Sequence, residues 1–336
     1  MTNIVSDQGD RTALSKAKQD VVTFSQKWGY EPIELARFKS KFHKLFFTES
    51  IIKKITRKMH AGDILLLQYP TYLGPRFENK LIHEVHEIGA KVVIIIHDLD
   101  SMRFDDTPQT LSSEIDELNA VDFVISDNSN MTDLLYTHGL KTKTSELEIF
   151  DYFHNEKIYD KEYSNDFINF AGNLNKSKFL FDKVNNFTLN LFGSWDNHGD
   201  VPENIIYNGS LPSNKLISKL NKGYGLVWDG ESSQSMVGTG GLYLKYTNPH
   251  KTSLYLSSGL PVIIWSDAAL AKFVKINNVG ITVDSLSDVS EKIKQITQVD
   301  YDIMAHNAKR ISQKLTNGYF LKRSLEKSED YILNQK

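Results

Sequence analysis

Short apolar runs alternate with amphipathic stretches through the first half of the chain. The runs at 63–69 (DILLLQY), 91–98 (KVVIIIHD) and 121–127 (VDFVISD) are rich in Ile, Leu and Val and are bounded by polar residues. Continuous runs of this length are typical of strands that are buried on both faces of a parallel sheet. The segment 75–90 begins with a proline and repeats apolar residues at helical spacing, so it is predicted to be a helix.

The second half of the chain repeats this alternation with different turns. Apolar runs at 166–174, 187–195, 222–230 and 260–267 predict further strands, and helical patterns separate several of them. The polar stretch 152–166 lies between the halves and is typical of a linker. We therefore predict an α/β protein with two Rossmann-like domains that face each other across a cleft.

The domain limits follow from these runs. We expect one domain over 1–155, a second over 166–316, and a C-terminal helix over 317–336 that could pack on either of them. A length of 336 residues fits two domains better than one.

Composition narrows the class of protein. The net charge of -3 gives no reason to expect a nucleic-acid partner. Cysteine is absent, which excludes disulfides and cysteine-ligated metal sites and is compatible with a cytoplasmic location, the one we expect. No apolar run approaches the ~20 residues of a membrane helix, and the N-terminal segment does not have the pattern of a signal peptide.

One lysine occupies an unusual position for a cation. Asn248 is expected to be an N-cap with Pro249 at the first helical position, which places Lys251 in the first turn of a short helix that ends near Gly259. The helix dipole disfavours a cation there, unless an anion such as a diphosphate binds to the same helix end. The alternative is an ordinary solvated lysine.

A second stretch has a similar pattern. In 170–180 a strand ends at Gly172 and Asn173, and Lys176 and Lys178 follow at the expected start of a helix. Such a turn also suits a phosphate, although glycine turns followed by lysines are common.

These motifs carry a family resemblance. The chain resembles GT-B glycosyltransferases and, more specifically, the bacterial glucosyltransferases that extend GlcNAc on serine-rich-repeat adhesins, a group often described as galactofuranosyltransferase-like. The matching pieces occur in the same order over most of the chain: Gly62, Asp63, Gln68, Pro70 and Thr71, then IHD at 96–98, FAGN at 170–173, GLVW at 225–228, and the pattern from Lys251 to Ile263.

The resemblance implies a UDP-sugar donor bound by the second domain and an acceptor bound by the first. Carried over by position, it implies donor contacts from Thr12, Lys176, Tyr207 and Lys251, with Lys178 as a rival to Lys176. Gly172, Asn173, Asn248 and Thr252 are expected beside them. The resemblance also implies a metal-independent reaction with no cofactor, and a homo-oligomer that could be a tetramer.

His97 and Asp98 follow an apolar run of the first domain, where a ligand-binding edge is expected. Either could take the proton of an acceptor hydroxyl in an inverting transfer. The pair could instead anchor its loop by hydrogen bonds. A metal site built with Asp100, Asp105 and Asp106 is a third interpretation, which the resemblance disfavours.

Two further stretches leave alternatives open. Residues 37–60 carry eight Lys and Arg residues against one acid, with apolar residues on one helical face. This pattern predicts a core helix with a solvated basic face, or a contact surface for an acidic partner, a second copy or anionic lipid. The Gly- and Ser-rich stretch 229–246 predicts a loop that closes over the donor or an ordinary connector.

The predicted activity is transfer of a hexose, with glucose or GlcNAc favoured, from a UDP-sugar to a GlcNAc-modified serine-rich-repeat glycoprotein. Two alternatives remain: a β-1,6-galactofuranosyltransferase of polysaccharide synthesis, and a non-catalytic glycosyltransferase-like partner subunit.

Overall fold

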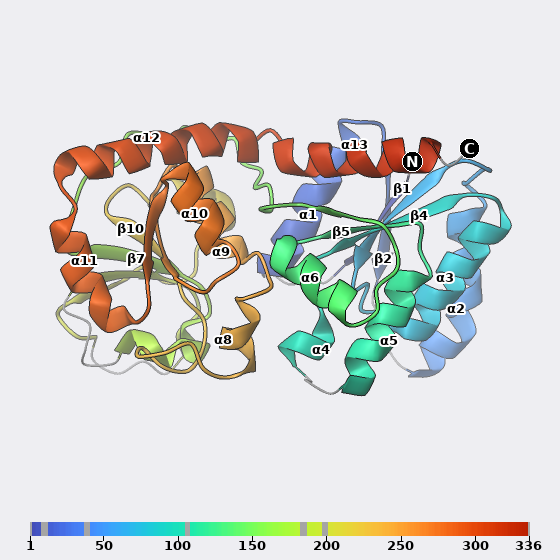
Figure 1. Ribbon diagram of the computed structural model, residues 1–336, viewed down its shortest axis with the longest axis horizontal. Helices are drawn as coiled ribbons and strands as arrows, with labels where there is room; N and C mark the ends of the chain where they lie inside the picture. Colours follow the sequence, from blue (N-terminus) through green and yellow to red (C-terminus); the bar gives the residue numbers. More distant parts are fainter. Residues whose placement is uncertain are drawn as a thin grey trace. The chain divides into compact units, whose positions relative to one another are not determined.

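The computed structural model describes residues 2–7, 13–36, 41–104, 108–181, 187–196 and 201–334. The chain forms two compact units, each built on a six-stranded parallel sheet (Figure 1). Unit 1 comprises residues 1–147 and 319–336, and unit 2 comprises residues 148–318. The stretch 152–166, which we had interpreted as a linker, therefore belongs to unit 2.

The sheet of unit 1 has the strand order β2-β1-β3-β4-β5-β6. All neighbouring pairs are parallel. The strands are β1 (Thr2–Asp7), β2 (Glu31–Ala36), β3 (Ile64–Tyr69), β4 (Lys91–Ile96), β5 (Phe123–Ser126) and β6 (Thr144–Glu146). The order reverses between β1 and β3, which makes this pair the topological switch point where open α/β sheets bind ligands.

Helices cover both faces of this sheet. They are α1 (Ala13–Gln26), α2 (Lys41–Thr56), α3 (Pro75–Glu87), α4 (Asp100–Arg103), α5 (Pro108–Asn119), α6 (Ser129–Thr137) and α13 (Tyr319–Leu333). Leu65 and Leu67 of β3 share one hydrophobic core with α2, α3, α5 and α6. Phe123 of β5 instead packs on Tyr331 of α13, with ring centroids 5.4 Å apart.

Helix α2 carries the basic stretch. Ile52, Ile55 and Met59 lie in the core, while Lys53 and Lys54 are exposed. The interpretation as a core helix with a basic outer face is therefore confirmed for this part of the stretch. Its residues 37–40 lie outside the described part of the chain.

The C-terminal helix α13 packs on unit 1. Ser324 and Ser328 are fully buried on its inner side, and the Ser324 hydroxyl donates to the carbonyl oxygen of Glu146 at 2.9 Å. The hydroxyl of Tyr30 donates to Glu329 at 2.7 Å. Small side chains let the helix approach the sheet closely, so α13 completes the core of the N-terminal unit although it is last in the sequence.

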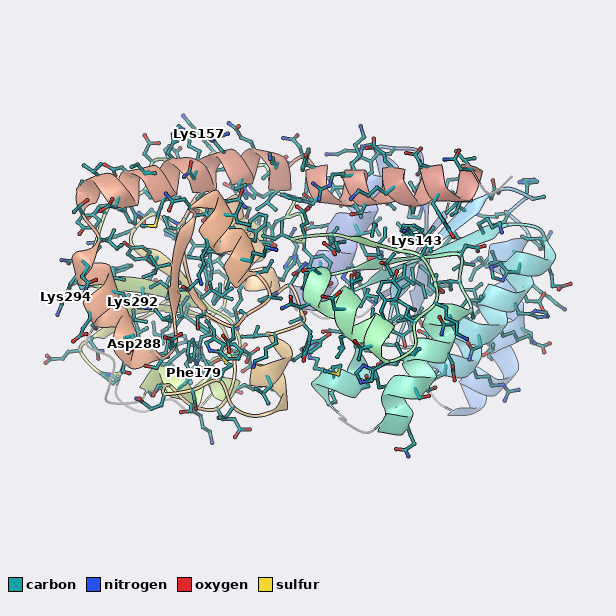
Figure 2. The ribbon with its side chains drawn as sticks, in the orientation of Figure 1. Lys143, Lys157, Phe179, Asp288, Lys292 and Lys294 are labelled. Atoms are coloured by element: carbon teal, nitrogen blue, oxygen red, sulfur yellow. The ribbon has the colours of Figure 1, made fainter. Side chains whose placement is uncertain are left out.

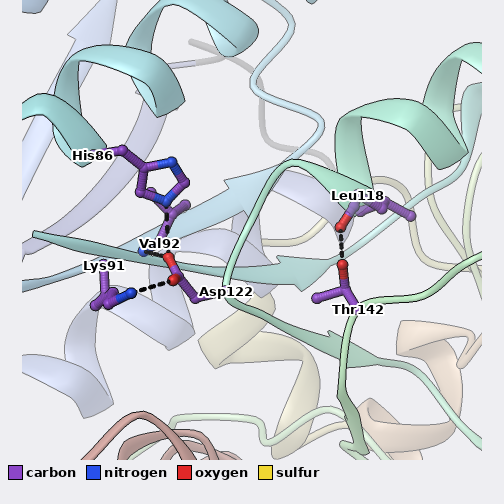
Figure 3. A network of polar contacts seen from close by, with 6 residues as sticks. All are labelled: His86, Lys91, Val92, Leu118, Asp122 and Thr142. Atoms are coloured by element: carbon purple, nitrogen blue, oxygen red, sulfur yellow. Dashed lines mark hydrogen bonds and ion pairs between the residues drawn. The ribbon is translucent and has the colours of Figure 1, made fainter. Parts of the chain in front are cut away.

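The strand ends opposite the switch-point edge are fixed by ion pairs and hydrogen bonds (Figure 3). Asp122 accepts hydrogen bonds from Lys91 Nζ (2.8 Å), the Val92 amide (2.8 Å) and His86 Nε2 (2.9 Å). Burial alone would raise the pKa of Asp122, but these donors outweigh burial and lower it. These three contacts tie the start of β4 and the end of α3 to the residue before β5, so we assign Asp122 no part in a binding site.

The sheet of unit 2 has the strand order β12-β11-β10-β7-β8-β9, again with parallel pairs. The strands are β7 (Phe167–Ala171), β8 (Thr188–Phe192), β9 (Ile205–Tyr207), β10 (Tyr224–Val227), β11 (Val262–Trp265) and β12 (Gly280–Val283). Its order reverses between β7 and β10, which is the switch point of unit 2.

Helices α7 to α10 lie between these strands, and α11 and α12 follow the last of them, β12. They are α7 (Ser213–Ile217), α8 (Thr239–Tyr243), α9 (His250–Ser257), α10 (Ala271–Asn277), α11 (Val289–Gln295) and α12 (Gln298–Leu315), with 3₁₀ turns η1 (Leu174–Lys176), η2 (Lys178–Phe181) and η3 (Leu286–Asp288). The stretch 229–246 thus contains α8 between its loops. No helix in the described ranges combines the length and the apolar character that spanning a membrane requires.

One aromatic contact, of Tyr255 on Gly225, holds helix α9 against the sheet. A Cβ added to Gly225 of β10 would lie 2.2 Å from the Tyr255 ring, so only glycine leaves room for it. The Tyr255 hydroxyl accepts a hydrogen bond from the Ala171 amide at 2.8 Å and is fully buried. This contact fixes α9, and with it Lys251, against the ends of β7 and β10.

Gly225→Ala is expected to destabilise the protein by about 1–3 kcal/mol, because the new methyl group displaces a buried ring. Gly240→Ala is the matched control, since a Cβ there would meet nothing within 4 Å. Thermal unfolding of both variants checks this. Equal melting temperatures would contradict the packing described here.

Candidate functional site

The switch point of unit 2 brings together residues from two strand ends and one helix. Gly172 follows β7, Trp228 follows β10, and Lys251 lies in the first turn of α9. The Lys251 ammonium is 3.4 Å from the Trp228 carbonyl oxygen and 4.7 Å from the centroid of the Phe170 ring. Phe179, labelled in Figure 2, supports this ring edge-on at 5.7 Å.

The environment of Lys251 suits an anion. The side chain is half-buried and lies against a carbonyl oxygen and a ring face, with no carboxylate paired to it among the described residues. A cation held in this way keeps its charge available to a bound phosphate.

The start of helix α9 differs from our expectation by one residue. Pro249, not Asn248, is the N-cap residue, and the Thr252 amide donates to the Pro249 carbonyl oxygen at 2.9 Å. Pro249 has an extended backbone (φ -62°, ψ 124°), so it is the last residue before the helix and not the first within it. Asn248 precedes the cap and is buried. Lys251 nevertheless remains in the first turn, as predicted.

Glycines form the floor beside Lys251. A Cβ on Gly172 would come 3.2 Å from Lys251 Cε, and a Cβ on Gly193 would come 1.7 Å from the Gly172 carbonyl oxygen. The Gly193 amide donates to the Gly209 carbonyl oxygen at 2.9 Å. The ends of β7 and β8 therefore approach each other as bare backbone beside Lys251, which a side chain at Gly193 would prevent. Gly193 follows an apolar run just as Gly172 does, and this signal could have identified it from sequence.

Aromatic residues border this glycine floor. The Tyr207 hydroxyl donates to the Gly193 carbonyl oxygen at 3.1 Å, and its ring meets Trp195 edge-on at 5.3 Å. Trp195 stacks on Phe181 with centroids 4.6 Å apart. The structure thus joins Tyr207 to the Gly172–Gly193 edge. No sequence pattern singles out Trp195.

The remaining donor candidates are placed less favourably. Lys176 and Lys178 are exposed on η1 and η2, and these 3₁₀ turns replace the helix start that we expected after Asn173. A single short turn lacks the aligned dipoles of a helix end, so the helix-terminus argument for these lysines is wrong. The Asn173 side chain accepts from the Asn175 amide at 3.1 Å.

The last two donor candidates are Thr252 and Thr12. Thr252 is fully buried, and its hydroxyl has no hydrogen-bond partner in the described part of the chain. Thr12 lies outside the described residues, so its prediction stays open.

His97 and Asp98 lie at the corresponding edge of unit 1, directly after β4. His97 donates from Nε2 to Gln68 Oε1 at 2.9 Å, and Asp98 forms an ion pair with Arg103 of α4. Both residues are buried, with 4% and 6% exposed. The ion pair is also what the loop-anchoring alternative predicts, so the geometry alone does not separate anchoring from catalysis. Asp105 and Asp106 lie outside the described residues.

Several buried carboxylates lie near this edge. Burial raises the pKa of Asp98 to about 6, with Arg103 opposing the shift and Asp100 adding to it. Burial, and then the charge of Glu78, raises the pKa of Glu117 to about 7. A carboxylate that titrates near neutral pH is suited to accept a proton during catalysis. No group of three potential metal ligands occurs among the residues that the structure describes.

Glu117→Gln is expected to stabilise the protein at pH 8 and to leave it unchanged at pH 4. The folded-state pKa of Glu117 lies above the ordinary glutamate value of 4.5, so the free energy of unfolding falls as pH rises from about 4.5 to 7, and glutamine removes this loss. We expect a gain of about 1 kcal/mol, because solvent screens part of the effect.

Denaturant unfolding at the two pH values measures the Glu117→Gln effect. Asp116→Asn, an exposed neighbour on α5, is the control and should change neither curve. A Glu117→Gln variant that is less stable than the wild type at pH 8 would contradict the assigned pKa direction.

Comparison with known structures identifies the class of fold. The HepE protein of Anabaena, solved in complex with UDP and glucose, is similar with a TM-score of 0.60 and 12% identity, and the match covers 100% of both chains. Together with the two parallel sheets and their switch-point edges, this similarity defines the chain as having the GT-B fold of glycosyltransferases.

Sequence comparison identifies the family. Residues 1–149 match the N-terminal domain and residues 168–328 the C-terminal domain of the Glucosyltransferase 3-like family. The chain belongs to this family. The β-1,6-galactofuranosyltransferase WbbI of Escherichia coli is 34% identical over 80% of this chain and 79% of its own length. Glucosyltransferase 3 of Streptococcus gordonii is 25% identical over 97% of this chain and 96% of its own.

Proposed function

We propose that this protein transfers a hexose from a UDP-sugar to a saccharide-bearing acceptor. The observation that carries the proposal is Lys251, which presents a half-buried cation at the switch point of unit 2 beside the bare backbone of Gly172. This arrangement fits a diphosphate. The UDP complex of HepE and the names of the two relatives support the same class of donor.

The residues divide into two groups with different tasks. In unit 2, Lys251 stabilises the negative charge that builds on the β-phosphate oxygen as the bond between the sugar C1 and that oxygen breaks. Tyr207 and Asn173 flank the nucleotide, and Lys176 or Lys178 adds charge from the rim. In unit 1, Asp98 or His97 takes the proton of the acceptor hydroxyl as its oxygen bonds to C1.

The transferred sugar has two candidates. The first is glucose or GlcNAc passed to a GlcNAc-modified serine-rich-repeat glycoprotein, and the name of the Glucosyltransferase 3 relative, which aligns over more of this chain, supports glucosyl transfer. The second is galactofuranose passed to a polysaccharide; the name of WbbI supports β-1,6-galactofuranosyl transfer, and its higher identity of 34% favours this candidate.

A donor panel tests the proposal. UDP-glucose, UDP-GlcNAc and UDP-galactofuranose are each incubated with a GlcNAc-peptide and with a GlcNAc-terminated oligosaccharide, and products are read by mass. A gain of one hexose or hexosamine identifies donor and acceptor together. Absence of both UDP binding and transfer would leave the third alternative, a non-catalytic partner subunit.

We propose that the reaction needs no metal ion. The motivation is a cation, Lys251, at the expected place of the diphosphate. EDTA is therefore expected to leave turnover unchanged. If EDTA stops turnover and magnesium or manganese restores it, the aspartates at 98–106 have the metal-binding role that we do not assign to them.

The assembly and location of the protein are also proposals. A homo-oligomer, for which we propose a tetramer, is motivated by the family resemblance and by exposed basic residues at the end of α2 and directly after it, namely Lys53, Lys54, Arg57 and Lys58. A cytoplasmic location agrees with the absence of cysteine.

A further inference from the structure

Lys18 of α1 is a lysine inside the protein. It is 1% exposed and is among the largest fully buried side chains of the chain. Its ammonium donates a hydrogen bond to the carbonyl oxygen of Pro70 and lies 4.9 Å from the centroid of the Tyr72 ring. Burying a lysine is costly for stability, so its position calls for a reason other than stability.

Lys18 lies at the switch point of unit 1. Helix α1 is the connection that follows β1, and Pro70 is the first residue after β3, the neighbour of β1 across the switch point. In unit 2, Lys251 of α9, the helix before β11, lies at the ends of β7 and β10. Each sheet therefore has a lysine where its strand order reverses, half-buried in unit 2 and buried in unit 1.

The loop that Lys18 contacts is held from two sides. Tyr72 has a left-handed backbone (φ 60°), which is strained for a bulky residue. The Thr71 amide and hydroxyl both donate to Glu78 Oε1 at 2.7 Å, and the Leu73 amide donates to the Thr71 hydroxyl at 3.1 Å. The loop thus runs between the buried ammonium of α1 and the buried carboxylate of α3, and these two contacts support its strained form.

The same ammonium acts on the carboxylates of this edge. Its charge favours the ionised forms of Glu78, Asp98 and Asp100, which come from three different elements. The other groups of this network are Arg103, which pairs with Asp98, Glu114, whose charge faces Asp100, and Glu117, whose charge faces Glu78. Lys18 and Arg103 are the cations that act on Asp98 among the described residues.

We propose that Lys18 is a positioning residue of the acceptor side, which holds the loop 70–74 in its strained form and places a buried cation at the sheet edge that carries Asp98. The inference rests on the proposed function, in which Asp98 takes the acceptor proton. Lys18 itself does not touch the substrate, because it is enclosed by protein.

The test compares Lys18→Met with Lys27→Met. Both substitutions remove one positive charge, and both lysines lie over an aromatic ring, since Lys27 lies 5.1 Å from the centroid of the Phe24 ring. Lys27 is exposed just beyond the far end of α1 and does not act on the carboxylates. For the wild type and both variants, kcat and KM for the GlcNAc-peptide are measured from pH 5 to 9 with UDP-glucose and with UDP-galactofuranose, and UDP binding is measured by calorimetry.

In Lys18→Met the acid limb of kcat/KM is expected to move to higher pH, because a cation that favours the ionised form of Asp98 is lost. Turnover then falls about fivefold at pH 6 and recovers to within about twofold of the wild type at pH 8, with UDP affinity unchanged. Lys27→Met should follow the wild-type profile. A purely structural lysine would lower activity equally at all pH values, so an unmoved acid limb in a folded Lys18→Met protein would overturn the inference.

Two further outcomes are distinguishable. If Lys18→Met does not fold, Lys18→Gln takes its place, because it removes the charge and keeps a hydrogen-bond donor for the Pro70 carbonyl oxygen: an acid limb that moves up supports the inference, and one that stays in place overturns it. If the wild type transfers no sugar from either donor, the proposed function fails before any variant is compared.

Discussion

Replacing Lys251 with alanine is expected to weaken UDP binding by about 1.5–3 kcal/mol, the contribution of a charge-assisted hydrogen bond to phosphate. The fold should survive, because Lys251 is half-buried at an edge and α9 is fixed mainly by Tyr255 on Gly225. Calorimetric titration with UDP measures the loss, which corresponds to about 10- to 150-fold in Kd.

Lys222 offers a matched control for this substitution. Its ammonium lies 5.3 Å from the centroid of the Phe167 ring, at the opposite end of the same strand β7, and 3.3 Å from Glu162. Lys222→Ala therefore removes a lysine over a phenylalanine ring without touching the switch point, and UDP affinity should not change. Equal losses in the two variants would show that the effect comes from the strand and not from a phosphate contact at Lys251.

Replacing Asp98 with asparagine is expected to lower kcat by about 10²–10⁴, with UDP affinity nearly unchanged. The reason is that the carboxylate acts on the acceptor hydroxyl and not on the donor. Since the pKa of Asp98 is about 6, wild-type kcat/KM should rise with pH through that value as the carboxylate loses its proton. Steady-state kinetics from pH 5 to 9 measure both effects.

The loop-anchoring alternative predicts a different result for the same variant. If Asp98 only holds Arg103, asparagine should lower the melting temperature and reduce acceptor use modestly at all pH values. His97→Ala is measured in parallel, because His97 is the second candidate for the base and contacts Gln68 instead. Full turnover in both variants would remove both residues from the catalytic group.

Local sequence patterns predict part of the architecture. Strands buried on both faces need continuous apolar runs, and those near β3, β4, β7 and β11 were located from such runs alone. The first-turn position of Lys251 and the glycine after β7 also follow from neighbouring residues, because turn and helix-start preferences depend on the local backbone. The sequence could therefore predict two parallel sheets and one end of a binding site.

The one-residue error at Asn248 has a local cause as well. Asn is a strong N-cap residue and Pro a favoured first helical residue, so both preferences supported the predicted start. The backbone of Pro249 is extended in the fold, and this moved the cap by one position. Packing of α9 against the sheet outweighed a preference worth about 1 kcal/mol.

Only the tertiary structure decided which residues meet at each edge. Lys251 reaches the Trp228 carbonyl across 23 residues of sequence, Lys18 reaches Pro70 across 52, and Ser324 reaches Glu146 across 178. Nothing local marks Lys18 as buried, since a lysine on an amphipathic helix is ordinarily solvated. Its burial arises because the switch point brings the β1–α1 connection beside the end of β3. Sequence periodicity sets which face of an element is apolar, whereas the order of strands in the sheet sets which polar groups that element must accommodate.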